Sequence, residues 1–303
     1  AFEITDITSG KALSPNGSTE TIEKISYLNV YTDVKTGAII KMQIIDGKEI
    51  SNRVKERVKA EALTLKSNGI TPTLAVVLVG DDKASQTYVA SKEKSTIACE
   101  MGSVAHKLPE STTQDELLAL IELLNADDSI DGILVQLPLP KHIDSNKILE
   151  AIDPSKDVDG FHAINVGKLN SGLDGFVPCT PLGIMELLKE YNIEVSGKNA
   201  VVVGRSNIVG KPMAALLLNA GATVTIAHSK TKNLAKVCQN AEIIVVAVGK
   251  PNFLTADMVS DGAVVIDVGI NRLDNGKLVG DCDYDNVAPK CSMITPVPGG
   301  VGP

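Results

Sequence analysis

Tyr88 and Lys92 stand four residues apart in the stretch YVASKEK, and both have side chains that can take part in chemistry. On a helix, residues four apart lie on one face, so the two side chains are expected to be neighbours. The plainer alternative is that Tyr-x-x-x-Lys belongs to the solvated surface of an ordinary helix. We interpret Glu93 and Lys94 in that way.

The position of this pair in the chain excludes one catalytic use of the pattern. Short-chain dehydrogenases carry Tyr-x-x-x-Lys after an N-terminal nucleotide fold. Here Tyr88 and Lys92 come long before the glycine-rich stretch VVVGRSNIVGKPMA. A catalytic dyad of that class is therefore not expected.

Other polar residues follow strands that the sequence predicts to be buried. Ser85, Tyr88 and Lys92 follow the apolar run TLAVVLVGDD, and Gln136 interrupts the apolar run GILVQLPLP. Ligands of open α/β folds bind at the carboxyl ends of parallel strands, so these side chains are expected at one edge of a sheet. A polar residue that merely ends a strand is the alternative for Gln136.

Two carboxylates follow in the turn-rich stretch KDVDG. Asp157 and Asp159 could supply a negative charge to the same edge, and a solvated turn is an equal alternative. The stretch PCTPLGIMELL comes next, and we expect Thr180 to cap a helix that has Pro181 in its first turn.

The stretch VVVGRSNIVGKPMA predicts a phosphate-binding turn between a strand and a helix. Gly204 and Gly210 allow a tight turn and close approach of the backbone, and the following helix offers free N–H groups to a pyrophosphate. Ser206 stands where the usual fingerprint has its second glycine. A purely structural strand-to-helix turn is the alternative.

The end of the next strand, TVTIAHSKT, favours NADP over NAD. An NAD site places an acidic residue there to accept the ribose hydroxyls, and this chain has His228, Ser229, Lys230 and Thr231 instead. No carboxylate repels a 2'-phosphate, and Arg205, Ser229 and Lys230 can donate hydrogen bonds to one. An ordinary polar loop is the alternative.

Strand-like and helix-like segments alternate along the chain from Met42, and most of the strands are entirely apolar. This order is typical of parallel sheets that are covered by helices on both faces. With 303 residues, the chain exceeds the size at which a single core usually stops growing. We predict an α/β protein of two domains, with a doubly wound nucleotide domain beginning near Lys198.

Composition and charge exclude several classes of function. A net charge of −8 without a basic cluster argues against nucleic acid as a partner. No apolar run is long enough to span a membrane. The five cysteines contain no C-x-x-C pair, so neither a disulfide framework nor a metal site is expected. The first residues lack the pattern of a signal peptide, which favours a cytoplasmic setting.

From Met42 to Pro303, the chain resembles the bifunctional methylenetetrahydrofolate dehydrogenase and methenyltetrahydrofolate cyclohydrolase family. The resemblance lies in a long ordered series of stretches: LAVVLVGDDKASQTYVASKEK, DGILVQLPLP, DPSKDVDGFHAINVGKL, PCTPLGIMELL, VVVGRSNIVGKPMAALLL, AHSKT, VIDVGIN and PVPGGVGP. Residues 1–41 have no counterpart in the family and are interpreted as an extension or an artefact. The family has a further helix after PVPGGVGP, which this sequence does not contain.

The resemblance implies four parts in the chain. They are the N-terminal segment 1–41, a folate-binding catalytic domain at 42–181, a Rossmann-like NADP domain at 182–294, and a Pro/Gly loop at 295–303 that returns to the first domain. The active-site cleft is expected between the two domains. The family also implies a homodimer that forms through the nucleotide domains.

The resemblance also implies a reaction and roles for named residues. NADP takes a hydride from 5,10-methylenetetrahydrofolate, and water opens the resulting methenyl cation to 10-formyltetrahydrofolate in the same cleft. Lys92 moves protons, Gln136 orients Lys92 without neutralising it, and Ser85 joins their network. Tyr88 stacks on the folate ring, and Asp159 accepts hydrogen bonds from the pterin.

Further residues are implied for binding. Pro298, Gly299 and Gly300 lie along the substrate, where glycines permit a flat ring to approach closely. The nucleotide contacts implied are Gly204, Arg205, Ser206, Gly210, Ser229 and Ile270. No metal is implied.

Two competing functions stay possible on the sequence. One is another two-domain α/β oxidoreductase, such as an amino-acid dehydrogenase, against which Gln136 and Asp159 argue. The other is a nucleotide-binding regulatory protein that has lost catalysis. Such a protein is expected to lack Lys92 or Gln136, and both are present.

Overall fold

The computed structural model describes residues 3–6, 11–13, 19–21, 28–32 and 39–303. Three strands near the N-terminus, β1 (Glu3–Asp6), β2 (Lys11–Leu13) and β3 (Thr19–Thr21), pair antiparallel in a small sheet of their own. Our interpretation of residues 1–41 as an extension or an artefact stays untested, and the rest of this segment, apart from residues 28–32 and 39–41, lies outside the described residues.

The larger sheet has seven strands in the order β10-β9-β11-β12-β15-β5-β4, and all its pairs are parallel except β4 with β5. The strands are β4 (Leu28–Thr32), β5 (Ile39–Ile44), β9 (Asn199–Val203), β10 (Thr223–Ala227), β11 (Ile243–Val246), β12 (Val264–Asp267) and β15 (Met293–Ile294). The central strands β11 and β12 are buried along their whole length because helices cover both faces.

Two apolar clusters cover the two faces of this sheet. On one face, α6 (Cys179–Glu190) and α7 (Gly210–Asn219) contribute buried residues such as Ile184 and Met213. On the other face, α8 (Leu234–Gln239) and α9 (Tyr284–Val287) contribute Cys238 and Val287. The predicted doubly wound parallel sheet is confirmed.

The smaller sheet has three parallel strands in the order β7-β6-β8: β6 (Thr73–Val79), β7 (Gly102–Leu108) and β8 (Gly132–Val135). The helix α2 (Lys83–Ala98) packs Val89 against one face. The helices α3 (Gln114–Ala126) and α4 (Ser145–Ala151) cover the other face, with Leu117 and Ile148 fully buried.

Short elements complete the described part of the chain. They are α5 (Ala163–Asn170), the hairpin of β13 (Asn271–Arg272) and β14 (Leu278–Val279), and the 3-10 turns η1 (Ala256–Met258) and η2 (Ala288–Lys290).

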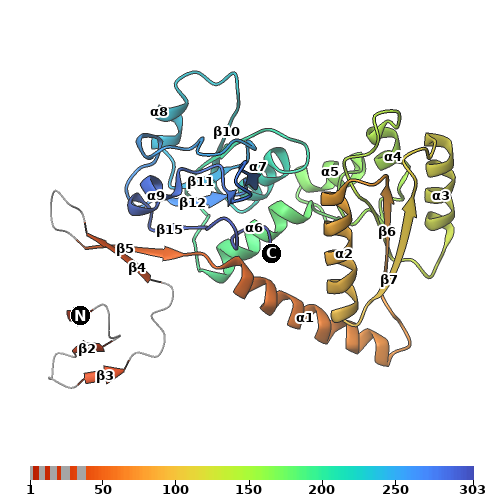
Figure 1. Ribbon diagram of the computed structural model, residues 1–303, viewed down its shortest axis with the longest axis horizontal. Coiled ribbons are helices and arrows are strands. Elements are labelled where there is room, and N and C mark those ends of the chain that lie inside the picture. The colour runs from red at the N-terminus through yellow and green to blue at the C-terminus, as the bar shows by residue number, and fades with distance from the viewer. Residues whose placement is uncertain (1–2, 7–10, 14–18, 22–27, 33–38) are drawn as a thin grey trace.

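The helix α1 (Gly47–Ser67) connects the two sheets. It follows β5 closely and is capped by Asp46, whose Oδ1 accepts a hydrogen bond of 3.0 Å from the Glu49 amide. Figure 1 shows it running from the end of β5 toward the side of the smaller sheet. Residues 42–44, which we expected in the folate domain, therefore belong by strand pairing to the larger sheet.

The start of α6 differs from the expected one. The helix begins at Cys179, after Pro178 in an extended conformation, and no side chain caps it. Our prediction that Thr180 caps this helix is wrong, because Thr180 already lies in the first turn. The expected domain boundary after residue 181 consequently falls inside α6.

We predict that Gly47→Ala destabilises the protein. The Gly47 amide donates to the Gly299 carbonyl at 2.9 Å, and a Cβ at Gly47 would overlap the Gly300 carbonyl. The backbone must shift to admit the methyl group, which should lower the unfolding free energy in urea by about 1–3 kcal/mol.

The matched control for this substitution is Gly167→Ala. Gly167 is an exposed residue of α5, and no atom lies within 4 Å of an added Cβ. Alanine there should leave the stability unchanged or raise it by up to about 1 kcal/mol. Equal effects of the two substitutions would contradict the close packing at Gly47.

Candidate active site

A cleft of about 610 Å³ lies between the two sheets, in the space bounded by α1, α2 and α6. The segment 208–209 and the C-terminal loop 300–303 close its remaining sides. The loop between the two predicted phosphate-binding glycines therefore opens into the same space as Lys92. This arrangement agrees with the expected cleft between a substrate half and a nucleotide half.

Lys92 and Gln136 meet at this cleft. The Lys92 Nζ donates to the Gln136 Oε1 at 3.2 Å, and the Gln136 Nε2 donates to the Leu137 carbonyl at 2.7 Å. The second bond fixes the amide so that its oxygen faces the lysine. Because an amide is neutral, it orients Lys92 without forming an ion pair with it and leaves its other hydrogen-bonding capacity for a ligand.

Asp159 also lines the cleft, and its carboxyl has an unusual environment. Burial raises the pKa of its carboxyl, the positive charge of Lys92 opposes that shift, and the nearby Asp157 adds to it. The Cys179 Sγ lies 3.8 Å from the Asp159 Oδ1. Burial likewise raises the pKa of the Cys179 thiol to about 11, so at neutral pH the thiol is protonated and can donate to Asp159.

Asp157 has a structural role, whereas Asp159 is available to bind a ligand. The Asp157 side chain is buried, and its Oδ2 accepts from the His162 amide and from the Asn165 Nδ2, each at 2.9 Å. These bonds hold the turn that carries Asp159. Of the two carboxylates in KDVDG, only Asp159 lines the cleft.

Tyr88 and Ser85, both on α2, differ in their exposure. The Tyr88 ring is half exposed and lines both the cleft and an adjoining cavity of about 270 Å³. Ser85 is buried, lies one turn before the core residue Val89, and donates its amide to the helix-capping Asp82 at 2.8 Å. Ser85 lines neither cavity, and its predicted part in the network of Lys92 stays a prediction.

The predicted substrate loop lines the adjoining cavity. Pro298, Gly299 and Gly300 line it together with Tyr88 and Ile270. Ile270 was expected at the cofactor and is half exposed at this point, between the end of β12 and the loop. The two cavities share Tyr88 and the 300–303 segment, so they form one continuous site.

The glycine turn has the close packing that its sequence predicts. Gly204 has a φ of 137°, and a Cβ there would overlap the Ala247 carbonyl. A Cβ at Gly210 would overlap the Gly204 carbonyl. The Ser206 Oγ accepts from the Val209 and Gly210 amides at 3.1 and 3.3 Å, and so satisfies donors at the start of α7.

The residues predicted to read a 2'-phosphate are exposed around this turn. Arg205, Ser229 and Lys230 have accessible side chains at the ends of β9 and β10. The turn after β10 is held by the His228 amide, which donates to the Thr231 Oγ1 at 2.8 Å. The group is therefore placed at the carboxyl edge of the larger sheet, where doubly wound folds bind nucleotides.

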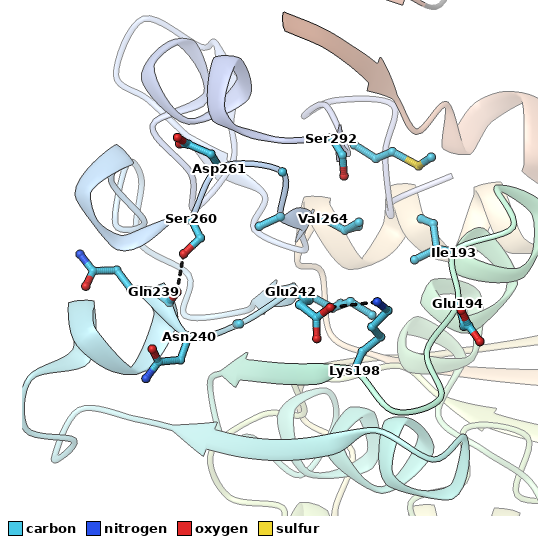
Figure 2. Close-up of a pocket in the computed structure, with 15 residues that line it drawn as sticks. Ile193, Glu194, Lys198, Gln239, Asn240, Glu242, Ser260, Asp261, Val264 and Ser292 are labelled. Atoms are coloured by element: carbon cyan, nitrogen blue, oxygen red, sulfur yellow. Dashed lines mark hydrogen bonds and ion pairs between the residues drawn. The ribbon is translucent and has the colours of Figure 1, made fainter.

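Another cavity, of about 600 Å³, lies at the opposite edge of the larger sheet (Figure 2). It is lined by Lys198 and Glu242, which pair at 2.9 Å, and by Ser260, which donates to the Gln239 carbonyl. None of the predicted site residues lines it. Lys198 and Glu242 are therefore paired with each other, as are Ser260 and the Gln239 carbonyl.

Two family models match the chain in consecutive parts. The catalytic domain of tetrahydrofolate dehydrogenase/cyclohydrolase matches residues 45–159, and the NAD(P)-binding domain of the same enzymes matches residues 178–303. The chain belongs to the tetrahydrofolate dehydrogenase/cyclohydrolase family. It is a bifunctional enzyme with methylenetetrahydrofolate dehydrogenase and methenyltetrahydrofolate cyclohydrolase activities, as the resemblance predicted.

Individual members of the family support this assignment. The bifunctional protein FolD of Campylobacter fetus is 78% identical over 262 residues, which cover 86% of this chain and 93% of that protein. The crystal structure of the bifunctional enzyme FolD from Campylobacter jejuni is 59% identical, covers 86% of this chain and 93% of its own, and superposes with a TM-score of 0.85.

A more distant member carries a cofactor in its crystal structure. The methylenetetrahydrofolate dehydrogenase-cyclohydrolase of Trypanosoma brucei, complexed with NADP cofactor and inhibitor, is 38% identical, with a TM-score of 0.81 over 86% of this chain and 91% of its own. Among the described residues of the present enzyme, no helix is both long and apolar enough to cross a membrane.

Cys179 and two buried carboxylates were not singled out from the sequence. Cys179 lies in the stretch PCTPLGIMELL, but no spacing rule connects it to Asp159, twenty residues earlier. The buried carboxylates Asp267 and Asp281 also escaped assignment. A signal for Asp267 exists in VIDVG, where an acidic residue ends an apolar strand.

We predict that Asp159→Asn raises the unfolding free energy at neutral and alkaline pH. The folded state holds the Asp159 pKa above its unfolded value, so ionising this carboxyl costs folding free energy. That cost is complete above the folded pKa and absent below the unfolded one. The advantage of the variant in urea denaturation should therefore shrink as the pH falls from about 8 to about 4.

Asp157→Asn is the control of identical chemistry. It weakens the acceptor for two buried donors and should lower the unfolding free energy by about 1–3 kcal/mol. If the unfolding free energies of the two variants changed in the same way with pH, the raised pKa of Asp159 would be contradicted.

Proposed function

We propose that this enzyme oxidises 5,10-methylenetetrahydrofolate with NADP and hydrolyses the methenyl product to 10-formyltetrahydrofolate in one cleft, with Lys92 as the proton-transfer residue. The observation that carries this proposal is the 3.2 Å hydrogen bond from the Nζ of Lys92 to the neutral Gln136 amide. Lys92 lines the cleft together with Asp159 and the substrate loop.

The lysine is suited to both halves of the hydrolysis. Water that adds to the methenyl carbon gives up a proton, and the nitrogen that leaves this carbon takes one up. Lys92 as the neutral amine can accept the proton from the adding water, and the ammonium so formed can donate it to the leaving nitrogen. The Gln136 Oε1 can accept a hydrogen bond from either form of the lysine. A glutamate at position 136 would instead pair with the lysine and hold its proton.

The remaining residues orient the folate. The Asp159 carboxyl can accept hydrogen bonds from the planar amino and ring N–H groups of the pterin. The half-exposed Tyr88 ring, between the two cavities, offers a surface for stacking. The backbone of Gly299 and Gly300 lines the same space, where the absence of side chains admits a flat ring. Ser85, which lines neither cavity, is proposed to support this arrangement from behind, at the buried start of α2.

The nucleotide half fits NADP. Gly204 and Gly210 let a pyrophosphate approach the backbone closely, and Arg205, Ser229 and Lys230 suit a 2'-phosphate. The free N–H groups expected at the start of α7 are absent, because the Gly210 and Lys211 amides are bonded to Ser206. Ser206 shapes the turn through its bonds to the helix start, and Ile270 lines the cavity beside Tyr88. Bound NADP supplies the acceptor for the hydride. NADP bound to the Trypanosoma brucei relative supports this choice.

The assembly and setting of the enzyme are proposed from family resemblance. We propose a cytoplasmic homodimer that forms through the nucleotide domains and takes one-carbon tetrahydrofolates as its substrates, with neither nucleic acid nor membrane as a partner. The net charge of −8 agrees with the absence of a polyanionic partner.

Lys92→Ala should abolish cyclohydrolase activity while NADP affinity is retained. Loss of a positioned proton carrier costs about 10²- to 10⁴-fold in rate, and Lys92 lies on α2, away from the glycine turn. Hydrolysis of supplied methenyltetrahydrofolate is followed by its absorbance, and NADP binding by calorimetry. Lys94→Ala, an exposed lysine on the same helix, is the control. Turnover of the Lys92 variant at the parent rate would exclude this role.

Arg205→Ala should raise the KM for NADP about tenfold or more, because a charge-assisted hydrogen bond to the 2'-phosphate is lost. The KM for NAD should stay nearly constant, since NAD lacks this phosphate. Dehydrogenase rates are measured with each nucleotide. Lys211→Ala is the control, because the Lys211 Nζ is already bonded to the Asn207 Oδ1 at 2.7 Å. An equal rise in both KM values would contradict NADP recognition by Arg205.

A further inference from the structure

A fully buried carboxylate lies behind the nucleotide edge of the larger sheet. Asp281 has no exposed surface, and its two oxygens accept four hydrogen bonds. The donors are the amides of Val248 at 2.6 Å, Gly249 at 2.9 Å and Lys250 at 2.9 Å, and the Asn271 Nδ2 at 2.9 Å. Three consecutive amides of one loop are thus held by a single side chain.

This loop supports the glycine turn. It follows β11, the neighbour of β9 in the sheet, and the Gly204 turn follows β9. The two turns touch, because a Cβ at Gly204 would overlap the Ala247 carbonyl. The position of residues 247–250 therefore decides how much space the phosphate-binding turn has.

A second buried carboxylate fixes the first. Asp267 ends β12, and its oxygens accept from the amides of Gly269 at 2.9 Å, Asp281 at 2.8 Å and Cys282 at 2.8 Å. Gly269 and Gly280 leave room for this arrangement, since a Cβ at either would overlap one of the two carboxylates. The backbone of Asp281 consequently cannot move independently of the end of β12.

The bonds of the Asp281 side chain do not involve Lys92, Gln136 or Asp159. Lys92 belongs to α2, Gln136 follows β8, and Asp159 belongs to the turn held by Asp157. Asp281 lines neither the cleft nor the adjoining cavity. Its contacts all lead to the loops of the nucleotide half.

We propose that Asp281 is a positioning residue for the dehydrogenase half of the reaction. It holds residues 248–250 against the glycine turn, and so determines the shape of the nucleotide-binding turn without contacting the nucleotide. The dehydrogenase step needs the nucleotide, and hydrolysis of the methenyl group does not. Loss of the Asp281 carboxylate should therefore separate the two activities.

The test is Asp281→Asn. The amide keeps the size of the side chain but turns an NH₂ group toward N–H donors, so at least one loop amide loses its acceptor. We expect the KM for NADP to rise roughly 10- to 100-fold. The rate of hydrolysis of supplied methenyltetrahydrofolate, and its KM, should stay at the parent values.

Asp283→Asn is the matched control. It makes the same chemical change two residues further on, where the side chain accepts only from the Asn286 Nδ2 at 2.8 Å and meets neither loop. Its KM for NADP should equal that of the parent. A Asp281→Asn variant with an unchanged KM for NADP, or with both activities lost in parallel, would overturn the proposal.

Asn271→Ala decides the question if Asp281→Asn does not fold. This change removes one donor to the carboxylate and leaves the three loop amides bound. A smaller rise in the KM for NADP, with hydrolysis intact, supports the positioning role. An unchanged KM for NADP, or an equal fall in both activities, refutes it.

Discussion

The path of β5 into α1 is the constraint on which the site depends. β5 pairs with β15 inside the larger sheet, and α1 leaves it toward the smaller sheet. At the junction, the Gly47 amide donates to the Gly299 carbonyl at 2.9 Å, and the Asp46 amide donates to the Tyr191 hydroxyl at 2.7 Å. These bonds tie the substrate loop and α6 to the first turn of α1, so the cleft walls share one anchor.

The cleft combines few charges with neutral partners. Lys92 is bonded to an amide, and Asp159 is accompanied by a protonated thiol. Each charged group is thus oriented without being neutralised by direct pairing. A folate bound between them can therefore interact with both charged groups, because neither is held in an ion pair within the protein. Catalysis by preorganised groups requires such available charges.

The sequence predicted those site residues whose places follow from the edge of a parallel sheet. Lys92 and Gln136 meet because each follows a neighbouring strand, β6 or β8. Ser85 shows the limit of such reasoning. It was grouped with Tyr88 and Lys92 by its position just after β6, yet its side chain is buried and lines neither cavity, whereas the Tyr88 ring is half exposed and lines both. Proximity along the chain did not decide the direction of the side chain.

Contacts between distant segments could not be predicted in the same way. The pairing of β5 with β15 joins residues near the two ends of the described chain, and the hydrogen bonds of Asp281 reach back to residues 248–250. No periodicity or local spacing encodes either. The start of α6 was misjudged for a local reason, because a helix can begin directly after an extended proline without a capping side chain.

The environment of Cys179 also decides how the open cleft withstands electrophiles and oxidants. The side chain is accessible, but thiolates rather than thiols react, and a thiol whose pKa is about 11 is ionised to only about one part in ten thousand at pH 7. The neighbouring Asp159 carboxyl adds to this effect by disfavouring a second negative charge. The enzyme therefore has an accessible cysteine at its active site whose thiol reacts slowly with electrophiles and oxidants.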